Sequence, residues 1–353
     1  MFFVNLLFVN HRDLFHPQAG GAERVIYEVG RRLVKKGIDV TWLSENVGNS
    51  LEEYDNIKLI HAGNKFTIHL LSLRYAKDYD VVIDSVAHAV PFFSYRVNKK
   101  SIALVHHVHQ DVVKYELSPF TAFLVRQLEK YIRYYPYIIS VSKTTKNELV
   151  KRFKIDESKI TVIYNGIDHD IYKPGEKSSI PTILWIGRLK NYKNPLDAVK
   201  IFKKLKTKAM MFIVGGGEME KEVKRAISGD KNIIYLGKVD ESQKIKLYQS
   251  SWVVLSTSFI EGWGMTIVEA NACGTPVVAY STGSIPEIIE DGVNGYLVNY
   301  KDIDRAAEII DYLLESESMV KYLSKKSYES SLKYDWNITA DEYYKYVWKI
   351  ANE

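Results

Sequence analysis

Several features that define other classes of protein are absent from this sequence. Cysteine occurs once, as Cys273, so no disulfide can form within the chain and a reducing, cytoplasmic compartment is expected. No apolar run approaches the ~20 residues of a membrane span, and residues 1–9 lack the basic start and cleavage site of a signal peptide. These absences predict a protein that is soluble or held at a membrane surface.

Two ligand-binding motifs are missing as well. No Gly-x-Gly-x-x-Gly follows an expected strand, which argues against a nicotinamide-dependent dehydrogenase. No metal-binding Asp-x-Asp stands at a strand end, because Asp302-Ile303-Asp304 comes at the start of a late helix, where capping accounts for it. We therefore expect neither a bound cofactor nor an obligatory metal.

Length and hydrophobic periodicity predict two α/β domains. The chain has 353 residues, of which 46% are hydrophobic, enough for two cores. Short apolar runs alternate with stretches of helical spacing, an order typical of parallel, doubly wound sheets. The expected strands are 2–9, 38–43, 57–60, 80–84, 101–105 and 137–141 in the first half, and 182–186, 210–214, 233–236, 252–255 and 276–279 in the second. The clearest expected helices are 22–36, 194–206, 217–227, 241–250 and 265–273.

Turn-forming residues mark the division between these domains. Asn165-Gly166, Pro174-Gly175 and Pro181 are typical of a linker. We therefore expect an N-terminal domain over 1–168 and a C-terminal domain over 169–334. An aromatic-rich final helix is expected over 335–353.

The charge is distributed unevenly along the chain. Basic residues exceed acidic ones by six in residues 1–165, whereas the remainder carries one net negative charge. This asymmetry is consistent with an anionic partner, either a membrane surface or an acidic acceptor. An ordinary solvated surface explains the asymmetry equally well. In residues 114–137, Arg126, Lys130 and Arg133 accompany many aromatic residues. That stretch is consistent with a surface facing anionic lipid or with a packed helix whose outer face is basic.

The densest group of candidate ligand-binding residues is 261–269. Gly262 and Gly264 stand just before an expected helix, where glycine lets a ligand approach the backbone and leaves helix N-terminal amides free for a diphosphate. Glu261 and Glu269, at the two ends of this stretch, can accept hydrogen bonds from sugar and ribose hydroxyls. Two solvated glutamates flanking a turn would give the same pattern.

A basic turn follows the strand expected at 182–186. Gly187 and Arg188 come at its carboxyl end, where open α/β sheets bind ligands, and Lys193 follows shortly after. A guanidinium fork and an ammonium group can together neutralise a leaving diphosphate. A basic surface turn is the alternative.

The first half contributes two weaker signals. Gly20 and Gly21 open the expected helix 22–36 and suggest the approach of a phosphate. The histidines His106, His107 and His109 follow strand 101–105, where they could contact a sugar, transfer protons or serve a structural role. Metal binding is disfavoured, because no further histidine or cysteine cluster is available.

Taken together and in this order, these motifs resemble glycosyltransferase family 4, a family of retaining enzymes whose GT-B fold has two Rossmann-like domains and a cleft between them. Further matching motifs are Asn165-Gly166-Ile167-Asp168, Gly274-Thr275-Pro276 and Pro286-Glu287. The resemblance covers nearly the whole chain. It implies that the first domain binds the acceptor, that the second binds a nucleotide sugar, and that helix 335–353 returns to the first domain.

The resemblance also implies roles for individual residues. Catalytic roles fall to His106, Arg188, Lys193 and Glu261, with His107 and His109 as candidates on the acceptor side. The donor would be contacted by Gly20, Gly21, Gly187, Arg188, Lys193, Val239, Glu261, Gly262, Trp263, Gly264, Met265, Thr266 and Glu269.

The resemblance implies a retaining transfer of a hexose from a UDP- or GDP-sugar to a hydroxyl of a glycan, a lipid-linked glycan or another acceptor. Two alternatives stay open at this point: a GT-B-fold epimerase of sugar nucleotides, and a non-catalytic nucleotide-sugar binder. The expected partners are the donor, the acceptor and an anionic surface on the cytoplasmic face of a membrane. No nucleic-acid partner is expected.

Overall fold

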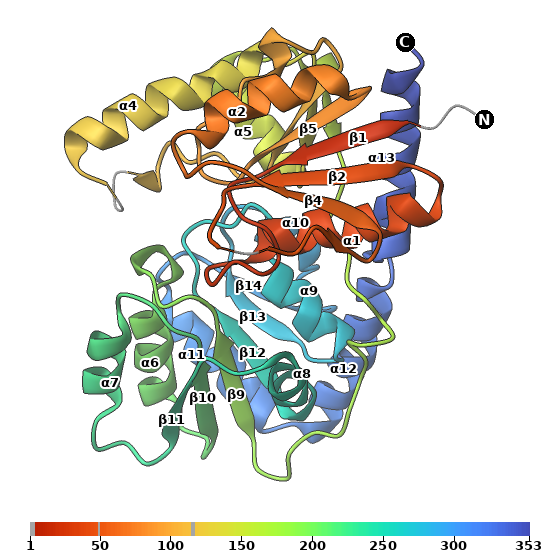
Figure 1. Ribbon diagram of the computed structural model, residues 1–353. Coiled ribbons are helices and arrows are strands. Elements are labelled where there is room, and N and C mark those ends of the chain that lie inside the picture. The colour runs from red at the N-terminus through yellow and green to blue at the C-terminus, as the bar shows by residue number, and fades with distance from the viewer. Residues whose placement is uncertain (1–3, 49, 114–116) are drawn as a thin grey trace. The chain divides into compact units, whose positions relative to one another are not determined.

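A computed structural model describes residues 4–48, 50–113 and 117–353 of the protein, which form two compact units (Figure 1). Unit 1 takes in Met1–Gly166 together with Trp336–Glu353, and unit 2 takes in Ile167–Asp335. The chain enters unit 2 after Gly166 and returns to unit 1 after Asp335. Within the described ranges, no helix has both the length and the apolarity needed to cross a membrane.

Unit 1 is built on an eight-stranded sheet in the order β3-β4-β2-β1-β5-β6-β7-β8, parallel except for the β3–β4 pair. Its strands are β1 (Asn5–Val9), β2 (Asp39–Ser44), β3 (Glu53–Tyr54), β4 (Ile57–His61), β5 (Val81–Val86), β6 (Ser101–Val105), β7 (Tyr137–Ser140) and β8 (Ile160–Val162). Its helices are α1 (Gly21–Lys35), α2 (Ile68–Tyr75), α4 (Pro119–Glu129), α5 (Lys143–Phe153) and α13 (Trp336–Ala351). Short 3-10 turns are η1 (Ala76–Asp78), η2 (Ser94–Arg96), η3 (Lys130–Tyr134) and η4 (Glu157–Lys159).

Unit 2 repeats this construction with a six-stranded sheet in the order β11-β10-β9-β12-β13-β14, in which every described pair is parallel. Its strands are β9 (Thr182–Ile186), β10 (Met210–Val214), β11 (Ile233–Gly237), β12 (Val253–Ser256), β13 (Val277–Tyr280) and β14 (Gly295–Val298). Its helices are α6 (Pro195–Lys204), α7 (Glu220–Ile227), α8 (Glu241–Ser250), α9 (Met265–Ala272), α10 (Ile285–Ile288), α11 (Ile303–Leu314) and α12 (Glu317–Ser331), with the 3-10 turn η5 (Asn191–Lys193).

Hydrophobic patterning explains these elements. Strands such as β1 and β5 are apolar and buried over almost their whole length, because helices cover both faces of a parallel sheet. Helix α1 buries Val25, Ile26, Val29 and Leu33 at helical spacing and ends before Gly37, whose φ of +86° suits a residue without a Cβ. The C-terminal helix α13 contacts α1 and belongs to the same unit (Figure 1).

The predicted strands are confirmed to within two residues, except that β1 begins at Asn5 and residues 2–3 lie outside the described part. The short strands β3, β8 and β14 were not predicted, because their few residues give no clear apolar run. The helix expected at 217–227 begins only at Glu220, so that prediction was wrong at its start. Gly217 has a φ of +157° and remains in the loop, which Met219 N closes by donating to Leu189 O.

The glycine loop after β10 fixes how closely the loops at this sheet edge approach. A Cβ on Gly215 would lie 1.8 Å from Gly187 O, and the Gly215 φ is +128°. Gly187 N also donates to Val214 O at 3.0 Å. Only glycine at position 215 therefore lets the loops after β9 and β10 lie against each other.

We predict that Gly215→Ala lowers the free energy of unfolding by at least about 3 kcal/mol, because the added methyl meets backbone atoms in addition to the unfavourable φ. Gly229→Ala is the matched control. Gly229 also has a positive φ, of +84°, but nothing lies within 4 Å of the place that an added methyl would take, so about 1 kcal/mol is expected. Urea denaturation of both variants measures the difference, and equal losses would contradict this account of the loop.

Candidate functional site

The loops at the carboxyl ends of β9 and β12 bring together two of the residues predicted from the sequence. Lys193 Nζ donates to Glu261 Oε1, forming an ion pair in which both side chains are mostly buried. Lys193 comes from η5, after β9, and Glu261 from the loop between β12 and α9. Residues 68 positions apart therefore meet because β9 and β12 are neighbours in the sheet.

Further hydrogen bonds hold the Glu261 carboxylate from one side. Ser258 Oγ donates to Oε1 at 2.8 Å, the same oxygen that accepts from Lys193. Backbone Glu261 O accepts from Ser284 N and Ser284 Oγ, both at 3.1 Å. Among the described residues none donates to Glu261 Oε2, which leaves this oxygen able to accept a hydrogen bond from a ligand.

The ion pair determines the charge of Lys193. Burial lowers the pKa of this lysine, but the Glu261 carboxylate and Tyr192 beside it raise the pKa, and the net shift is upward. Arg188, with a smaller effect, lowers the Lys193 pKa because the two cations lie near each other. Lys193 is therefore an ammonium at neutral pH, held close to a second positive charge.

Arg188 differs from Lys193 in having no partner. Its side chain is exposed, and the described residues give its guanidinium neither a hydrogen bond nor an ion pair. Gly187, just before it, follows β9 directly at the sheet's carboxyl edge. The guanidinium fork therefore has donors available for an anion.

The glycine-rich stretch 262–266 leads into α9. Helix α9 begins at Met265 after the N-cap residue Gly264. Within the described chain, the N–H groups of Gly264 and Thr266 donate no hydrogen bond, so they are available to an anion. The Trp263 side chain is not positioned to bind an anion. Its indole is buried, and its ring centroid lies 5.0 Å from that of Tyr334.

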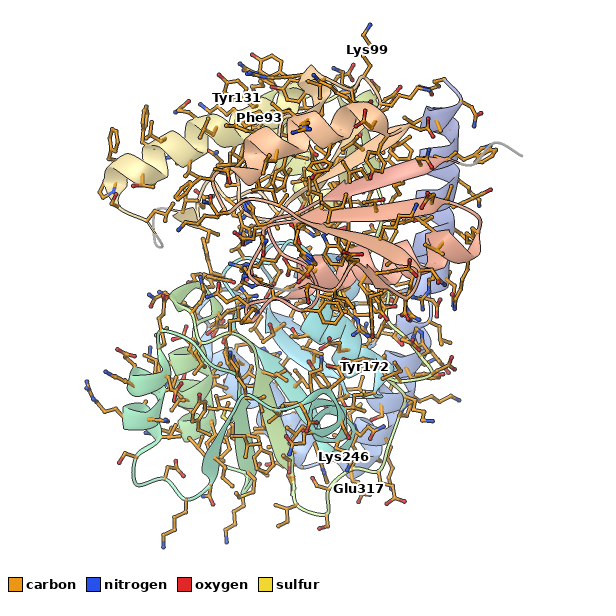
Figure 2. The ribbon with its side chains drawn as sticks, viewed as in Figure 1. Phe93, Lys99, Tyr131, Tyr172, Lys246 and Glu317 are labelled. Atoms are coloured by element: carbon orange, nitrogen blue, oxygen red, sulfur yellow. The ribbon has the colours of Figure 1, made fainter. Side chains whose placement is uncertain are left out.

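Glu269 has a hydrogen-bond network that shares no described residue with the one around Glu261. Its carboxylate accepts from Tyr248 Oη at 2.8 Å, from Lys244 Nζ at 3.2 Å and from Tyr172 Oη at 3.5 Å. Tyr172 is labelled in Figure 2, in unit 2. Glu269 was predicted from the sequence, but these three partners, from the start of unit 2 and from α8, were not.

A shallow hollow lies between two glycine turns of unit 2. Gly216, Gly217, Tyr235, Gly237 and Lys238 line it, with Glu220 and Lys224 from α7. Val239, expected near the donor base, follows this lining directly in sequence but is not part of it.

In unit 1, Gly20 and Gly21 stand at the N-terminus of α1, as expected. Buried Glu23 fixes this turn, since its carboxylate accepts from Gly20 N at 2.6 Å and from Asn10 Nδ2 at 2.8 Å. Asn10 follows β1, so Glu23 ties the strand end to the helix start. The carboxylate thereby occupies part of the helix N-terminus, which makes the paired glycines a weaker anion site than their sequence suggested.

The three histidines after β6 have different surroundings. His106 Nε2 lies 3.0 Å from Ser85 Oγ, and burial, together with nearby His109, lowers the pKa of His106 to about 4. His109 is held on both ring nitrogens, by Glu129 Oε1 at 3.2 Å and Ala87 O at 3.1 Å. His109 is thus committed to structure, whereas the neutral imidazole of His106 suits a hydrogen bond to a hydroxyl. The His107 ring is tilted by 36° against that of His109, with ring centroids 3.7 Å apart.

A second histidine cluster in unit 1 was not predicted. The His11 ring centroid lies 5.1 Å from that of His69 and 5.4 Å from that of His88. His11 follows β1 and His88 follows β5, so the rule that ligands bind at strand ends could have identified both. Within the described ranges, no three His, Cys, Asp or Glu side chains are placed to hold a metal ion.

Two family descriptions match this chain and together span most of it. Residues 19–171 match "Glycosyltransferase Family 4", and residues 167–330 match "Glycosyl transferases group 1". The chain belongs to glycosyltransferase family 4. The resemblance stated from the sequence is thereby confirmed, and with it membership of an enzyme family.

Relatives within glycosyltransferase family 4 include two curated proteins. An uncharacterised glycosyltransferase of Methanocaldococcus jannaschii is 33% identical over 61% of this chain and 60% of its own length. A D-inositol 3-phosphate glycosyltransferase of Mycolicibacterium smegmatis is 28% identical over 58% of this chain and 50% of its own length. The chain thus spans about half the length of the curated relatives it matches.

Solved structures show the same two-domain GT-B architecture. A protein of Anabaena, solved in complex with UDP and glucose, has a TM-score of 0.78 and 19% identity, covering 98% of this chain and 100% of that one. At this identity the likeness establishes the fold. The predicted fold class, two Rossmann-like α/β domains, is confirmed.

We predict that the protein loses stability in acid because of the buried histidine His11. Burial, with the neighbouring His69 and Arg12, lowers the pKa of His11 to about 3, so the folded state stays unprotonated where the unfolded state, with a pKa near 6.5, binds a proton. The free energy of unfolding should therefore fall as the pH drops below 6.5, by about 2–3 kcal/mol for His11 at roughly pH 4.5.

Calorimetry of the unmodified protein and of the His11→Asn variant, each at pH 6.5 and at pH 4.5, measures this effect. The variant should lose less of its melting temperature in acid than the unmodified protein does. His169→Asn, in unit 2, serves as the control for replacing a partly buried histidine. An acid-induced loss of the same size in His11→Asn would show that His11 is not the group responsible.

Proposed function

We propose that the protein is a retaining glycosyltransferase that moves a hexose from a UDP- or GDP-sugar to a hydroxyl of a glycan, a lipid-linked glycan or another acceptor. One observation carries the proposal. Two cations at the carboxyl edge of the unit 2 sheet stand beside a carboxylate with one free oxygen. Anionic phosphates and sugar hydroxyls are the two features that such a site recognises together.

The cations suit the diphosphate of the donor. Exposed Arg188 offers a planar fork for phosphate oxygens, and Lys193 adds a second charge that the Glu261 pair keeps protonated. The free N–H groups of Gly264 and Thr266 add donors from the start of α9. We propose that these groups stabilise the charge that builds up on the diphosphate as it leaves.

The two glutamates suit the hydroxyls of the donor. Glu261 Oε2 is free to accept from the hexose, while Lys193 and Ser258 fix the carboxylate through Oε1. Glu269 is fixed by Tyr248 and Lys244 and keeps lone pairs for ribose hydroxyls. The hollow beside Gly237 and Lys238 is our candidate for the nucleotide base, with Val239 beyond it. No bound metal or cofactor is required in this scheme.

Retention follows from attack on one face of the sugar. In the proposed reaction the bond from the anomeric carbon to the diphosphate breaks, and the acceptor oxygen bonds to the same face of that carbon. A departing phosphate oxygen takes the acceptor's proton, so no protein nucleophile is needed. Glu261 is bound to a lysine and a serine, which supports a role in holding hydroxyls rather than in forming a covalent intermediate.

We propose that unit 1 supplies the acceptor side. His106 is neutral at physiological pH, so it can form a hydrogen bond with a hydroxyl without adding charge. His107 is the second candidate there, whereas His109 is held by Glu129 and Ala87. A relative is named a D-inositol 3-phosphate glycosyltransferase, so a phosphorylated polyol belongs in any panel of acceptors to be tested.

The single cysteine, Cys273, is buried and has no second cysteine in the sequence to pair with, which supports placing the enzyme in the reducing cytoplasm.

We predict that Arg188→Ala lowers kcat/KM by at least about a hundredfold, because the leaving diphosphate loses its bidentate donor. Arg188→Lys should retain part of the activity, since the charge stays but the fork is lost. Arg225→Ala, on α7, is the matched control and should be unaffected. Transfer rates are measured with whichever UDP- or GDP-sugar raises the melting temperature most. Near-normal rates in Arg188→Ala would end the assignment.

Retention predicts the stereochemistry of the product. An α-linked donor should yield an α-linked product, which proton NMR of the first-formed glycoside reads from the anomeric coupling. Inversion would contradict the proposed front-face attack. Incubation without acceptor separates the alternatives, because an epimerase would convert the donor to its epimer, and a non-catalytic binder would leave it intact in every mixture.

A further inference from the structure

Helix α4 of unit 1 has an exposed face that is apolar. Phe120 and Phe123 are 72% and 57% exposed, and Leu124 is also exposed. The side chains directed into the unit are those of Ala122 and Glu129, which are buried. A helix at the surface of a soluble domain normally turns polar residues outward, so this arrangement is reversed.

The apolar side chains form one stripe along α4. Leu117, Phe120, Leu124 and Leu128 follow each other at steps of three or four residues, and all are exposed. Figure 1 draws α4 in yellow as a helix whose N-terminal turns extend past α2 and α5 of the same unit. Phenylalanine and leucine gathered on a projecting helix mark a surface that binds something apolar.

The charges on this segment have one sign at the surface. Glu129 is fully buried and turned inward, where it accepts from His109 N at 2.5 Å and from Gln110 Nε2 at 2.6 Å. The charged groups left toward solvent are Arg126 on α4 and Lys130 and Arg133 on η3. The apolar stripe is thus bordered by cations, with no acidic side chain exposed among described residues 117–134.

Aromatic contacts extend this surface to α2. Phe93 lies between the helices, with its ring centroid 6.3 Å from His69 of α2 and 5.8 Å from Tyr131 of η3. Phe93 and Tyr131 are labelled beside each other in Figure 2. On the α2 side, Phe66 and Leu70 are more than 70% exposed, and Lys65 Nζ lies 5.0 Å from the Phe66 ring centre. The combination of apolar and basic groups therefore repeats in the first turn of α2 and in the residues just before it.

We propose that this surface, the exposed side chains of Leu117–Leu128 with Phe66 and Leu70, binds the surface of an anionic lipid bilayer. Phenylalanine and leucine would enter the boundary between headgroups and acyl chains, while Arg126, Lys130 and Arg133 meet lipid phosphates. A second copy of the chain is a poor occupant, because two such surfaces would bring like charges together. A membrane offers both the apolar and the anionic component along the whole length of the helix.

Binding to lipid vesicles tests this proposal without any reaction. It is independent of the proposed donor chemistry, because the full chain is sedimented with vesicles and no sugar is present. Vesicles of phosphatidylcholine with phosphatidylglycerol should carry the protein down at low salt, and raising the salt should release much of it. The proposal is overturned if these vesicles bind no protein, or if pure phosphatidylcholine vesicles bind it equally well.

Substitutions in each component should weaken this binding. Phe120→Asp with Phe123→Asp should lower the affinity for anionic vesicles by at least about a hundredfold, since two large apolar side chains no longer enter the bilayer. Lys130→Gln with Arg133→Gln should lower it about thirtyfold, at the usual contribution of a basic residue near an anionic surface. Unchanged affinity in either double variant would refute the proposal.

Matched controls come from α12 in unit 2. Tyr322 is 54% exposed, so Tyr322→Asp adds an acidic group at a comparable helical position, and Lys321→Gln with Lys325→Gln removes two exposed charges. Both controls should bind vesicles as the unmodified protein does. Melting temperatures of all variants show whether a loss of binding reflects unfolding.

A fluorescent label locates the contact directly. Because Cys273 is buried, a cysteine introduced by Leu124→Cys is the accessible site for an environment-sensitive dye. Anionic vesicles should shift the emission of this label to shorter wavelength and raise its intensity. The same dye on Tyr322→Cys should not respond. A response of equal size at both positions would show that α4 is not the surface in contact.

Discussion

The ion pair between Lys193 and Glu261 is the interaction on which the site in unit 2 depends. It joins the loop after β9 to the loop after β12, and each partner changes what the other can do. The carboxylate keeps the buried lysine protonated, and the lysine, with Ser258, uses one carboxylate oxygen so that the other is left for a ligand. A site for an anion bearing hydroxyls needs both effects, since an isolated buried charge of either sign would be neutralised.

Close approach of backbone loops makes this pair geometrically achievable. Gly215 lets the loop after β10 lie against Gly187, and Gly283 does the same against Glu261, where a Cβ would come within 2.6 Å of the carbonyl oxygen. The parallel sheet brings these loops to a single edge, because β10, β9, β12 and β13 are successive neighbours. Gly215 and Gly283, which are far apart in sequence, thus permit close backbone approaches at the same edge of the sheet.

Local patterns in the sequence were enough to predict most of the fold and part of the candidate site. Long apolar runs such as 182–186 predict strands, because burial between helices demands them, and the strand-end rule then selects Arg188, Lys193 and Glu261. What could not be predicted is non-local. Strand β14 is short, and its position in the sheet comes from pairing with β13. The residues next to Glu269 in sequence give no indication that Tyr248 and Lys244 form hydrogen bonds with its carboxylate. The strand-end rule also applies to His11, which was nevertheless not predicted.

The direction of a single carboxylate, that of Glu129, determines which side chains of α4 are exposed. Periodicity alone permits a helix that buries its phenylalanines and presents Arg126 and Lys130 to water. In the structure Glu129 is inside, satisfied by the His109 backbone and Gln110, and burying it fixes the rotation of α4 about its axis. Phe120 and Phe123 must then lie outside, because they occupy the opposite side of the same helix. The buried contacts of Glu129 with His109 and Gln110 thereby determine which residues of α4 are exposed at the surface.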